Sequence, residues 1–266
     1  QEAYELFGIF IPRETVVQIQ SAGGRTDVRG DRDPSISWEG PMSVLVNRLS
    51  ASASEIFAGA VQDYGRGLVI GSQTFGKGTV QALLPVNEGQ LKLTIAKFYR
   101  ISGQSTQHQG VIPDIQFPSA FDPTEIGESA LDTALPWDQI RSLRYRPIDT
   151  PQARLAQLID RHQARIATDP DFKALLKRTE RALELSGETG ISLHLETRIQ
   201  EREANNQALL DIENMRRESL GLETAQSISE LEAAAKEDDV SSDASLMESA
   251  RILLDEIQIN RRLAGL

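Results

Sequence analysis

The sequence contains no cysteine and only three histidines in 266 residues. Without cysteine, the chain has no disulfides, no cysteine nucleophile and no thiolate metal site. None of His108, His162 and His194 belongs to a His-x-x-x-His pair, so we expect no zinc site. We expect His108 to be an exposed loop residue, which argues against a Ser-His-Asp triad.

Long apolar runs are also lacking. No stretch approaches the roughly eighteen apolar residues that would predict a membrane span, and the first residues show no signal-peptide pattern. The net charge is −11, and we count ten basic and eleven acidic residues in 1–120, which leaves 18 basic and 28 acidic residues in the remainder. Nucleic-acid binding needs concentrated positive charge, so we expect no nucleic-acid partner.

A serine stands where a strand pattern changes to a helix pattern. Residues 42–49 (MSVLVNRL) alternate as in a strand, and residues 55–64 have apolar side chains at helical spacing. We therefore expect Ser52 at a helix start, where unpaired backbone N–H groups can bind an oxyanion. The position also suits a simple helix cap, because Ser52 and Glu55 form a capping-box pattern. This local pattern leaves a nucleophile and a cap both open.

A single lysine lies in a glycine turn further along the chain. Lys77 is the lysine of FGKG, between the strand-like segments 67–71 (GLVIG) and 90–99 (QLKLTIAKFY). A lysine acts as a general base only as the neutral amine, which burial in an apolar pocket favours. Lys77 could then take the proton of Ser52. The alternative is a turn lysine with its ammonium in water, and sequence spacing does not exclude it.

The run SASASEIFAGAVQDYGRGLVIGSQTFGKGTVQ resembles the catalytic core of the tail-specific, or C-terminal processing, serine proteases. By this resemblance Ser52 is the nucleophile, and Lys77, twenty-five positions later, is the general base. Gln81 matches the family's supporting glutamine, and Asp63 matches an acidic residue sometimes assigned to the catalytic group. We expect Asp63 to act through structure, because an ion pair with the lysine would oppose its role as a base. The backbone N–H of Ala53 is expected to supply one oxyanion donor.

The resemblance extends on both sides of this run. Residues 8–12 (GIFIP) and 97–115 (KFYRISGQSTQHQGVIPDI) look like segments of the family's protease fold. Residues 135–140 (LPWDQI), followed by a charged helical tail, are most similar to the periplasmic branch, whose members carry an additional C-terminal helical domain. The resemblance implies protein substrates recognised by an apolar, unstructured C-terminus and presented as an added strand. It implies no metal or organic cofactor. It also implies a possible helical-repeat lipoprotein as adaptor, and a location in the periplasm or cell envelope of a Gram-negative bacterium.

Parts of the family pattern are missing from this sequence. The glycine-rich loop thought to complete the oxyanion hole, the PDZ module and the N-terminal helical region have no counterpart, so the chain looks like the C-terminal part of a longer protein. An inactive fragment or binding scaffold that retains the protease fold is therefore the alternative to a working enzyme. A crotonase-type acyl-CoA enzyme is a third possibility, and no set of residues here supports it.

The second half of the chain has a helical pattern. Helices are predicted at 151–167, 170–185, about 193–220 and 244–263, and the first two begin with a proline after a good N-cap residue.

We expect three parts in the chain. Residues 1–120 form the C-terminal part of a crotonase-like α/β protease domain with the Ser/Lys dyad, 121–147 a linker, and 148–266 an α-helical accessory domain. Leu135, Pro136 and Trp137 are expected to dock the linker onto the protease part.

Overall fold

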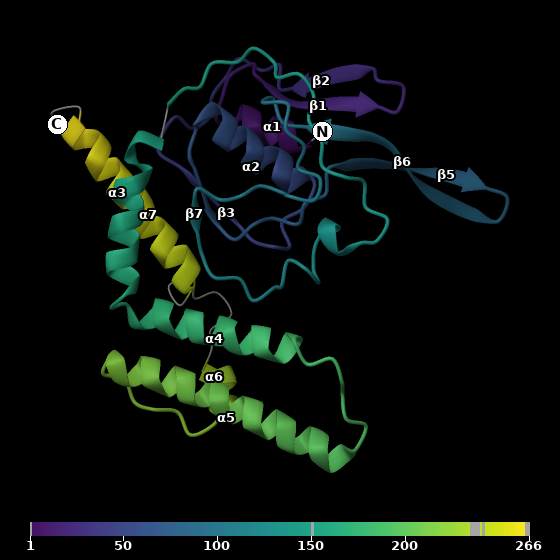
Figure 1. Ribbon diagram of the computed structural model, residues 1–266. Coiled ribbons are helices and arrows are strands. Elements are labelled where there is room, and N and C mark those ends of the chain that lie inside the picture. The colour runs from purple at the N-terminus through teal and green to yellow at the C-terminus, as the bar shows by residue number, and fades with distance from the viewer. Residues whose placement is uncertain (1, 150–151, 235–239, 241–242, 264–266) are drawn as a thin grey trace. The chain divides into compact units, whose positions relative to one another are not determined.

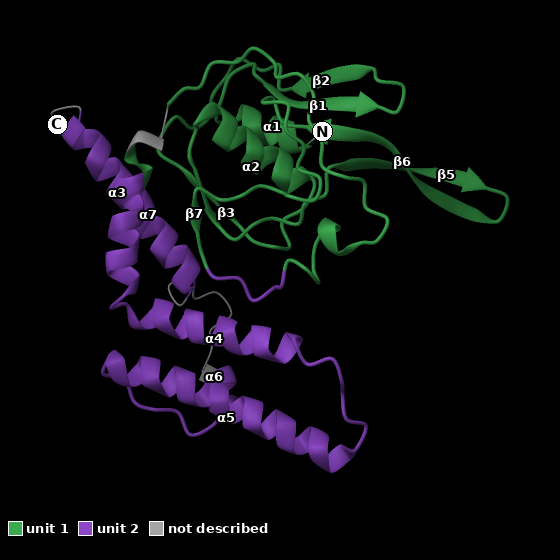
Figure 2. Ribbon diagram, in the orientation of Figure 1, with its two compact units in different colours: residues 1–117, 123–155 green, residues 118–122, 156–266 purple. Residues whose placement is uncertain are grey.

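The computed structural model describes residues 2–149, 152–234, 240 and 243–263. The chain divides into two compact units (Figure 2). The first comprises residues 1–117 and 123–155, and the second comprises residues 118–122 and 156–266. The first is mixed α/β and the second is helical, as the sequence predicts.

The first unit contains two sheets and two α-helices (Figure 1). The four-stranded antiparallel sheet has the order β2-β1-β6-β5, and the three-stranded parallel sheet has the order β3-β4-β7. Its elements are α1 (Glu2–Gly8), β1 (Thr15–Ser21), β2 (Thr26–Gly30), β3 (Ser43–Val46), α2 (Ala53–Tyr64), β4 (Leu68–Gly71), β5 (Thr79–Val86), β6 (Gly89–Tyr99), β7 (Ile115–Gln116) and the 3-10 turn η1 (Glu128–Ala130).

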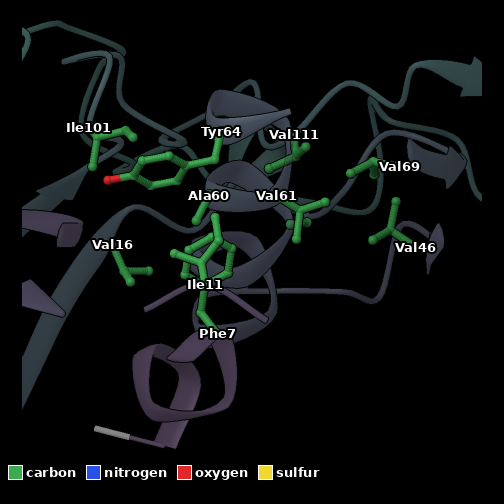
Figure 3. Packing of buried hydrophobic residues seen from close by; sticks show 11 residues of the cluster. Phe7, Ile11, Val16, Val46, Ala60, Val61, Tyr64, Val69, Ile101 and Val111 are labelled. Atoms are coloured by element: carbon green, nitrogen blue, oxygen red, sulfur yellow. The ribbon is translucent and has the colours of Figure 1, made fainter. Parts of the chain in front are cut away.

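Helix α2 connects the parallel strands β3 and β4 and lies at the centre of the core. Parallel strands need a crossover connection, which a helix commonly provides. All four residues of β4 are buried, as is typical of a strand covered on both faces. Figure 3 shows the apolar side chains gathered around α2. The core cluster consists of Phe7, Ile11, Val16, Val46, Ala58, Ala60, Val61, Tyr64, Val69, Ile101 and Val111. Burial of a large apolar side chain contributes about 1.5–3 kcal/mol, so this cluster fixes α2 firmly.

The helical unit contains α3 (Gln152–Ile166), whose first residues belong to the first unit, followed by α4 (Pro170–Ser186), α5 (Leu195–Ser219), α6 (Ile228–Ala234) and α7 (Ala244–Leu263). These include the four predicted helices, with shifts of one or two residues at their ends. At the start of α4, the Asp169 carboxylate accepts a hydrogen bond from the Phe172 N–H (2.9 Å), and Pro170 occupies the first helical position. The N-cap and proline pattern therefore predicts this helix start correctly.

The segment predicted as a linker packs on the first unit. The Trp137 indole donates to the carbonyl of Ser105 (2.9 Å), and Lys97 Nζ donates to the carbonyl of Pro136 (2.9 Å). The predicted docking is therefore confirmed for Pro136 and Trp137, whereas Leu135 is exposed. Further along, the Ile148 N–H donates to the carbonyl of Tyr64 (2.8 Å). These contacts tie residues 136–148 to the first unit.

Candidate active site

Ser52 lies at the N-cap position of α2, as the sequence predicts. Its backbone has φ = 54° and ψ = −103°, a conformation that non-glycine residues rarely adopt and that is commonly found at functional sites. The serine is half-buried. The N–H of Ala53 has no hydrogen-bond acceptor among the residues described, so it can serve as a donor at the start of the helix.

Glu55 connects the helix start to the loop that carries Lys77. Its side chain is fully buried on the face of α2 that also buries Ala58 and Val61. One carboxyl oxygen accepts hydrogen bonds from the Ser52 N–H (2.7 Å) and the Lys77 N–H (3.0 Å). The other oxygen accepts from the Thr74 hydroxyl (2.5 Å) and the Gly76 N–H (2.7 Å).

This single carboxyl group therefore fixes Ser52 relative to the FGKG turn. Burial raises the pKa of Glu55, although its four hydrogen bonds oppose that shift. The Ser52 contact is one half of the predicted capping box. The capping interpretation is thus correct, but it is incomplete because three of the four donors lie in the segment 74–77.

The FGKG turn is also held from its other side by residues 107–108. The Gly78 N–H donates to the Gln107 side-chain oxygen (2.8 Å), and the His108 N–H donates to the carbonyl of Gly76 (2.9 Å). Gly76 has φ = 92°, and a Cβ atom there would lie 2.6 Å from the His108 carbonyl oxygen. Glycine is therefore required at this position by the backbone conformation and by the close approach.

His108 and Lys77 are each half-buried in this arrangement. The expectation that His108 is an exposed loop residue is wrong, because its loop packs directly against the turn and its Nε2 atom is buried. The Lys77 side chain makes no ion pair or hydrogen bond with the described residues, and this includes the Ser52 hydroxyl.

A second layer of buried polar groups supports the turn. Arg48 is only 2% exposed, and its guanidinium donates to the carbonyl of Thr74 (2.6 Å) and to that of Ile126. Burial lowers the pKa of Arg48. Gln107 is fully buried and donates to the Glu128 carboxylate (3.0 Å). Residues 126–128, predicted as linker, therefore accept hydrogen bonds from Arg48 and Gln107, two residues that contact the FGKG turn segment.

Asp63 and Gln81 lie away from the contacts that join Ser52 to the turn. The Asp63 carboxylate receives two hydrogen bonds from Arg100 (2.6 and 3.1 Å) and one from the Ser102 hydroxyl (3.3 Å). Asp63 follows Ser52 by eleven positions, roughly 16 Å along α2. Gln81 is exposed on β5, and its side-chain nitrogen lies 3.4 Å from the Thr94 hydroxyl on β6.

Neither Asp63 nor Gln81 hydrogen-bonds to the side chain of Ser52 or Lys77 in the described part of the chain. Arg100, directly after the end of β6, is the half-buried ion-pair partner of Asp63.

Sequence reasoning missed the linking role of Glu55 and the burial of Arg48. A signal for the first was present, because Glu55, Ala58 and Val61 share one helical face and an acidic residue on a buried face needs hydrogen-bond donors. No comparable sequence pattern marks the burial of Arg48.

The described residues contain no group of three or more His, Asp or Glu side chains arranged to hold a metal ion. Among the described helices, none combines the length and the apolar character that crossing a bilayer requires.

Comparison with known proteins identifies two matched regions of the chain. Residues 1–117 match the model of peptidase family S41, and residues 121–258 match that of the C-terminal domain of tail specific protease. The chain is 38% identical over 271 residues to a tail-specific protease of Haemophilus influenzae, an alignment that covers 97% of this chain and 38% of the relative. The chain therefore spans well under half of that relative's length.

Two further comparisons cover smaller shares of the chain. A carboxy-terminal-processing protease of Bartonella bacilliformis is 55% identical over 78 residues, which are 29% of this chain and 18% of the relative. A solved structure of a photosystem II D1 C-terminal processing protease has 35% identity and a TM-score of 0.40, and the match covers 46% of this chain and 31% of that one. With its two matched regions in this order, the chain belongs to the tail-specific proteases of peptidase family S41.

Proposed function

We propose that this protein is a serine endopeptidase in which Ser52 is the nucleophile and Lys77 the general base. The observation that carries the proposal is the buried Glu55 carboxyl group, which binds the backbone N–H groups of both residues. A preorganised catalytic pair requires a group that holds its two chain segments together, and the Glu55 carboxyl group does this at the start of α2. The unusual backbone of Ser52 supports the same assignment.

The proposed reaction has two stages. Ser52 Oγ attacks the peptide carbonyl carbon while the neutral Lys77 amine takes the hydroxyl proton, and the N–H of Ala53 donates to the resulting oxyanion. The C–N bond breaks as Lys77 returns the proton to the leaving amine. Water then attacks the ester and gives a proton to Lys77, and this proton passes to Ser52 Oγ when the ester bond breaks.

The ion pair between Asp63 and Arg100 favours a lysine base. A carboxylate beside Lys77 would stabilise its ammonium, whereas Asp63 is engaged with a different cation. We assign Asp63 a structural role and Gln81 an orienting role that requires bound substrate. Contacts in catalytic groups are often loose without substrate, so the separate Ser52 and Lys77 side chains are compatible with a dyad.

The substrates we propose are proteins with an apolar, unstructured C-terminus, in keeping with the description of the Haemophilus influenzae relative as a tail-specific protease. No cofactor is needed for this chemistry. The helical unit is a candidate docking surface for a helical-repeat adaptor lipoprotein, and the proposed location is the cell envelope. Loss of adaptor binding on removal of residues 148–266 would support that partner, and unchanged binding would exclude it.

Cleavage of an unfolded protein with an apolar C-terminal tail tests the proposed function. We expect Ser52→Ala and Lys77→Ala each to reduce the rate about 10³-fold or more. The matched controls Ser54→Ala and Lys173→Ala change an exposed serine two residues away and an exposed lysine in α4, so they should leave cleavage unchanged. Equal cleavage by the unsubstituted protein (the parent) and by the Ser52→Ala variant would refute the mechanism. If the parent cleaves no substrate protein, whichever C-terminal tail it carries, a binding scaffold would be favoured.

A further inference from the structure

Residues 123–129 reach the FGKG turn from outside the part of the chain that matches peptidase family S41. That match ends at residue 117, whereas the match to the C-terminal domain of tail specific protease begins at residue 121. The segment nevertheless belongs to the first compact unit (Figure 2). Its residues 123–125 are exposed, and Gly127 and Glu128 are buried. A short piece of the C-terminal match is therefore part of the protease unit.

Glu128 is hydrogen-bonded to both ends of the FGKG turn, once directly and once through Gln107. Its backbone N–H donates to the carbonyl of Phe75 (2.9 Å). Its carboxylate accepts a hydrogen bond from the Gln107 side-chain nitrogen (3.0 Å), and the Gln107 side-chain oxygen accepts one from the Gly78 N–H (2.8 Å). Phe75 and Gly78 are the first and last residues of FGKG, so these bonds span the turn that carries Lys77.

The orientation of the Gln107 amide depends on Glu128. Both side chains are buried, so each polar atom needs a partner within the protein. A carboxylate offers acceptors only, so the amide nitrogen of Gln107 faces Glu128 and the amide oxygen is left to face the Gly78 N–H. Without Glu128 the amide is free to rotate, and its NH₂ group would then oppose the Gly78 N–H. Glu128 therefore fixes the acceptor that holds the residue directly after Lys77.

Arg48 joins the same segment to the residue that precedes the turn. Its buried guanidinium donates to the carbonyl of Thr74 (2.6 Å). It also donates to the carbonyl of Pro123 (3.2 Å) and to the Ser129 hydroxyl (3.3 Å). Gly127 has φ = 140°, and a Cβ atom there would lie 2.0 Å from Nη2 of Arg48, so glycine lets the segment lie against the guanidinium. The segment is thus fixed at both of its ends.

We propose that Glu128 is a positioning residue for Lys77 and that residues 123–129 complete the catalytic turn. This inference rests on the proposed function and assigns part of it to the region that matches the C-terminal domain. Glu55 fixes the Lys77 N–H, and Glu128, through Gln107, fixes the residue that follows. Misplacement of a catalytic group by about 1 Å can slow a reaction by about 10²-fold. Loss of Glu128 should therefore slow proton transfer to Lys77 without weakening substrate binding.

Acylation of Ser52 by a peptide p-nitrophenyl ester, measured over a range of ester concentrations, tests the proposal. Glu128→Ala should lower the maximal acylation rate about tenfold or more, and the ester concentration that gives half of this rate should stay within about twofold of the parent's value. Glu128→Gln should restore most of the rate, because its amide oxygen can still accept from Gln107. Glu125→Ala, which changes an exposed glutamate three residues earlier, should alter neither quantity.

Two further measurements separate positioning from a general loss of stability. Val16→Ala removes buried methyl groups from the core of the same unit, so it should lower the urea midpoint and leave the acylation rate of the folded protein unchanged. Hydrogen exchange followed by mass spectrometry reports on the turn itself. Peptides that span residues 75–79 should exchange faster in Glu128→Ala than in the parent, and at the parent's rate in Glu128→Gln and Val16→Ala.

Parental acylation and exchange in Glu128→Ala would overturn the inference and leave the proposed function standing. Equal losses of rate in Glu128→Ala and Glu125→Ala would overturn it too, as would an equal loss in Val16→Ala, because the effect would then not be specific to the turn. If the parent itself is not acylated at Ser52, the proposed function fails. Faster exchange in Glu128→Ala would in that case assign Glu128 a structural role alone.

Discussion

Replacement of Glu55 by alanine should destabilise the first unit strongly. The Thr74 hydroxyl and the Gly76 N–H are buried donors, and each costs about 1–3 kcal/mol when left without an acceptor. The N–H groups of Ser52 and Lys77 are partly buried and can bind water, so each loses about 0.5–1.5 kcal/mol. Even the lower ends of these ranges give a loss of about 3 kcal/mol in the free energy of unfolding.

Urea unfolding followed by tryptophan fluorescence measures this loss selectively. The two tryptophans, Trp38 and Trp137, belong to the first unit, so their emission reports on that unit. With an m-value of about 2 kcal/mol per molar urea, the midpoint should fall by about 1.5 M. Glu55→Gln should fall less, because its amide oxygen replaces one carboxyl oxygen.

Glu88→Ala is the control, because Glu88 is exposed in the β5–β6 turn and a surface substitution usually changes stability by less than about 0.5 kcal/mol. An unfolding free energy for Glu55→Ala within about 1 kcal/mol of the parent would mean that the four hydrogen bonds do not hold the two loops together.

Three further predictions test other parts of the structure. Gly76→Ala should cost about 1–3 kcal/mol in tryptophan-detected unfolding because of its positive φ and the nearby His108 carbonyl, whereas Gly89→Ala, with nothing within 4 Å, should change little; equal effects would contradict the packing described. Asp63→Asn should cost about 1–3 kcal/mol because it leaves the half-buried Arg100 guanidinium without its anion. Arg100→Met should restore part of that loss in the double variant, and additive losses would argue against coupling. In the helical unit, burial alone would raise the pKa of Glu248, but hydrogen bonds from His162 and Arg165 lower it below the ordinary value of 4.5. The stability it contributes is therefore present above pH 4.5 and lost as the pH falls through the lowered pKa, so helix unfolding monitored by circular dichroism should be less pH-dependent in Glu248→Gln below pH 4.5. An unchanged pH dependence in that variant would refute this assignment.

The sequence predicts those features of the fold that depend on local patterns. The helix that begins after Ser52, the buried strand β4 and the proline-started helix α4 all follow from periodicity and capping residues. The positions of Ser52 and Lys77 in their elements were likewise predictable.

Long-range polar contacts were not predictable in this way. The partners of Glu55 lie about twenty residues away, and Arg48 reaches carbonyl groups from two distant segments. A pattern within one helix cannot identify such partners, because they are fixed by how the loops pack. The same limit applies to residues 121–147, whose polar composition predicts a linker although the Trp137 indole hydrogen-bonds to Ser105 of the first unit.

Acylation of Ser52 tests the central claim most directly. The protein is mixed with a peptide p-nitrophenyl ester, and the first turnover is followed by release of nitrophenol and by mass spectrometry of the intact chain. We predict one acyl group on Ser52, none in Ser52→Ala, and acylation about 10²–10⁴-fold slower in Lys77→Ala and not restored by Lys77→Arg. Acylation of Lys77→Ala at the parent's rate, or of the parent at a residue other than Ser52, would contradict the proposed dyad.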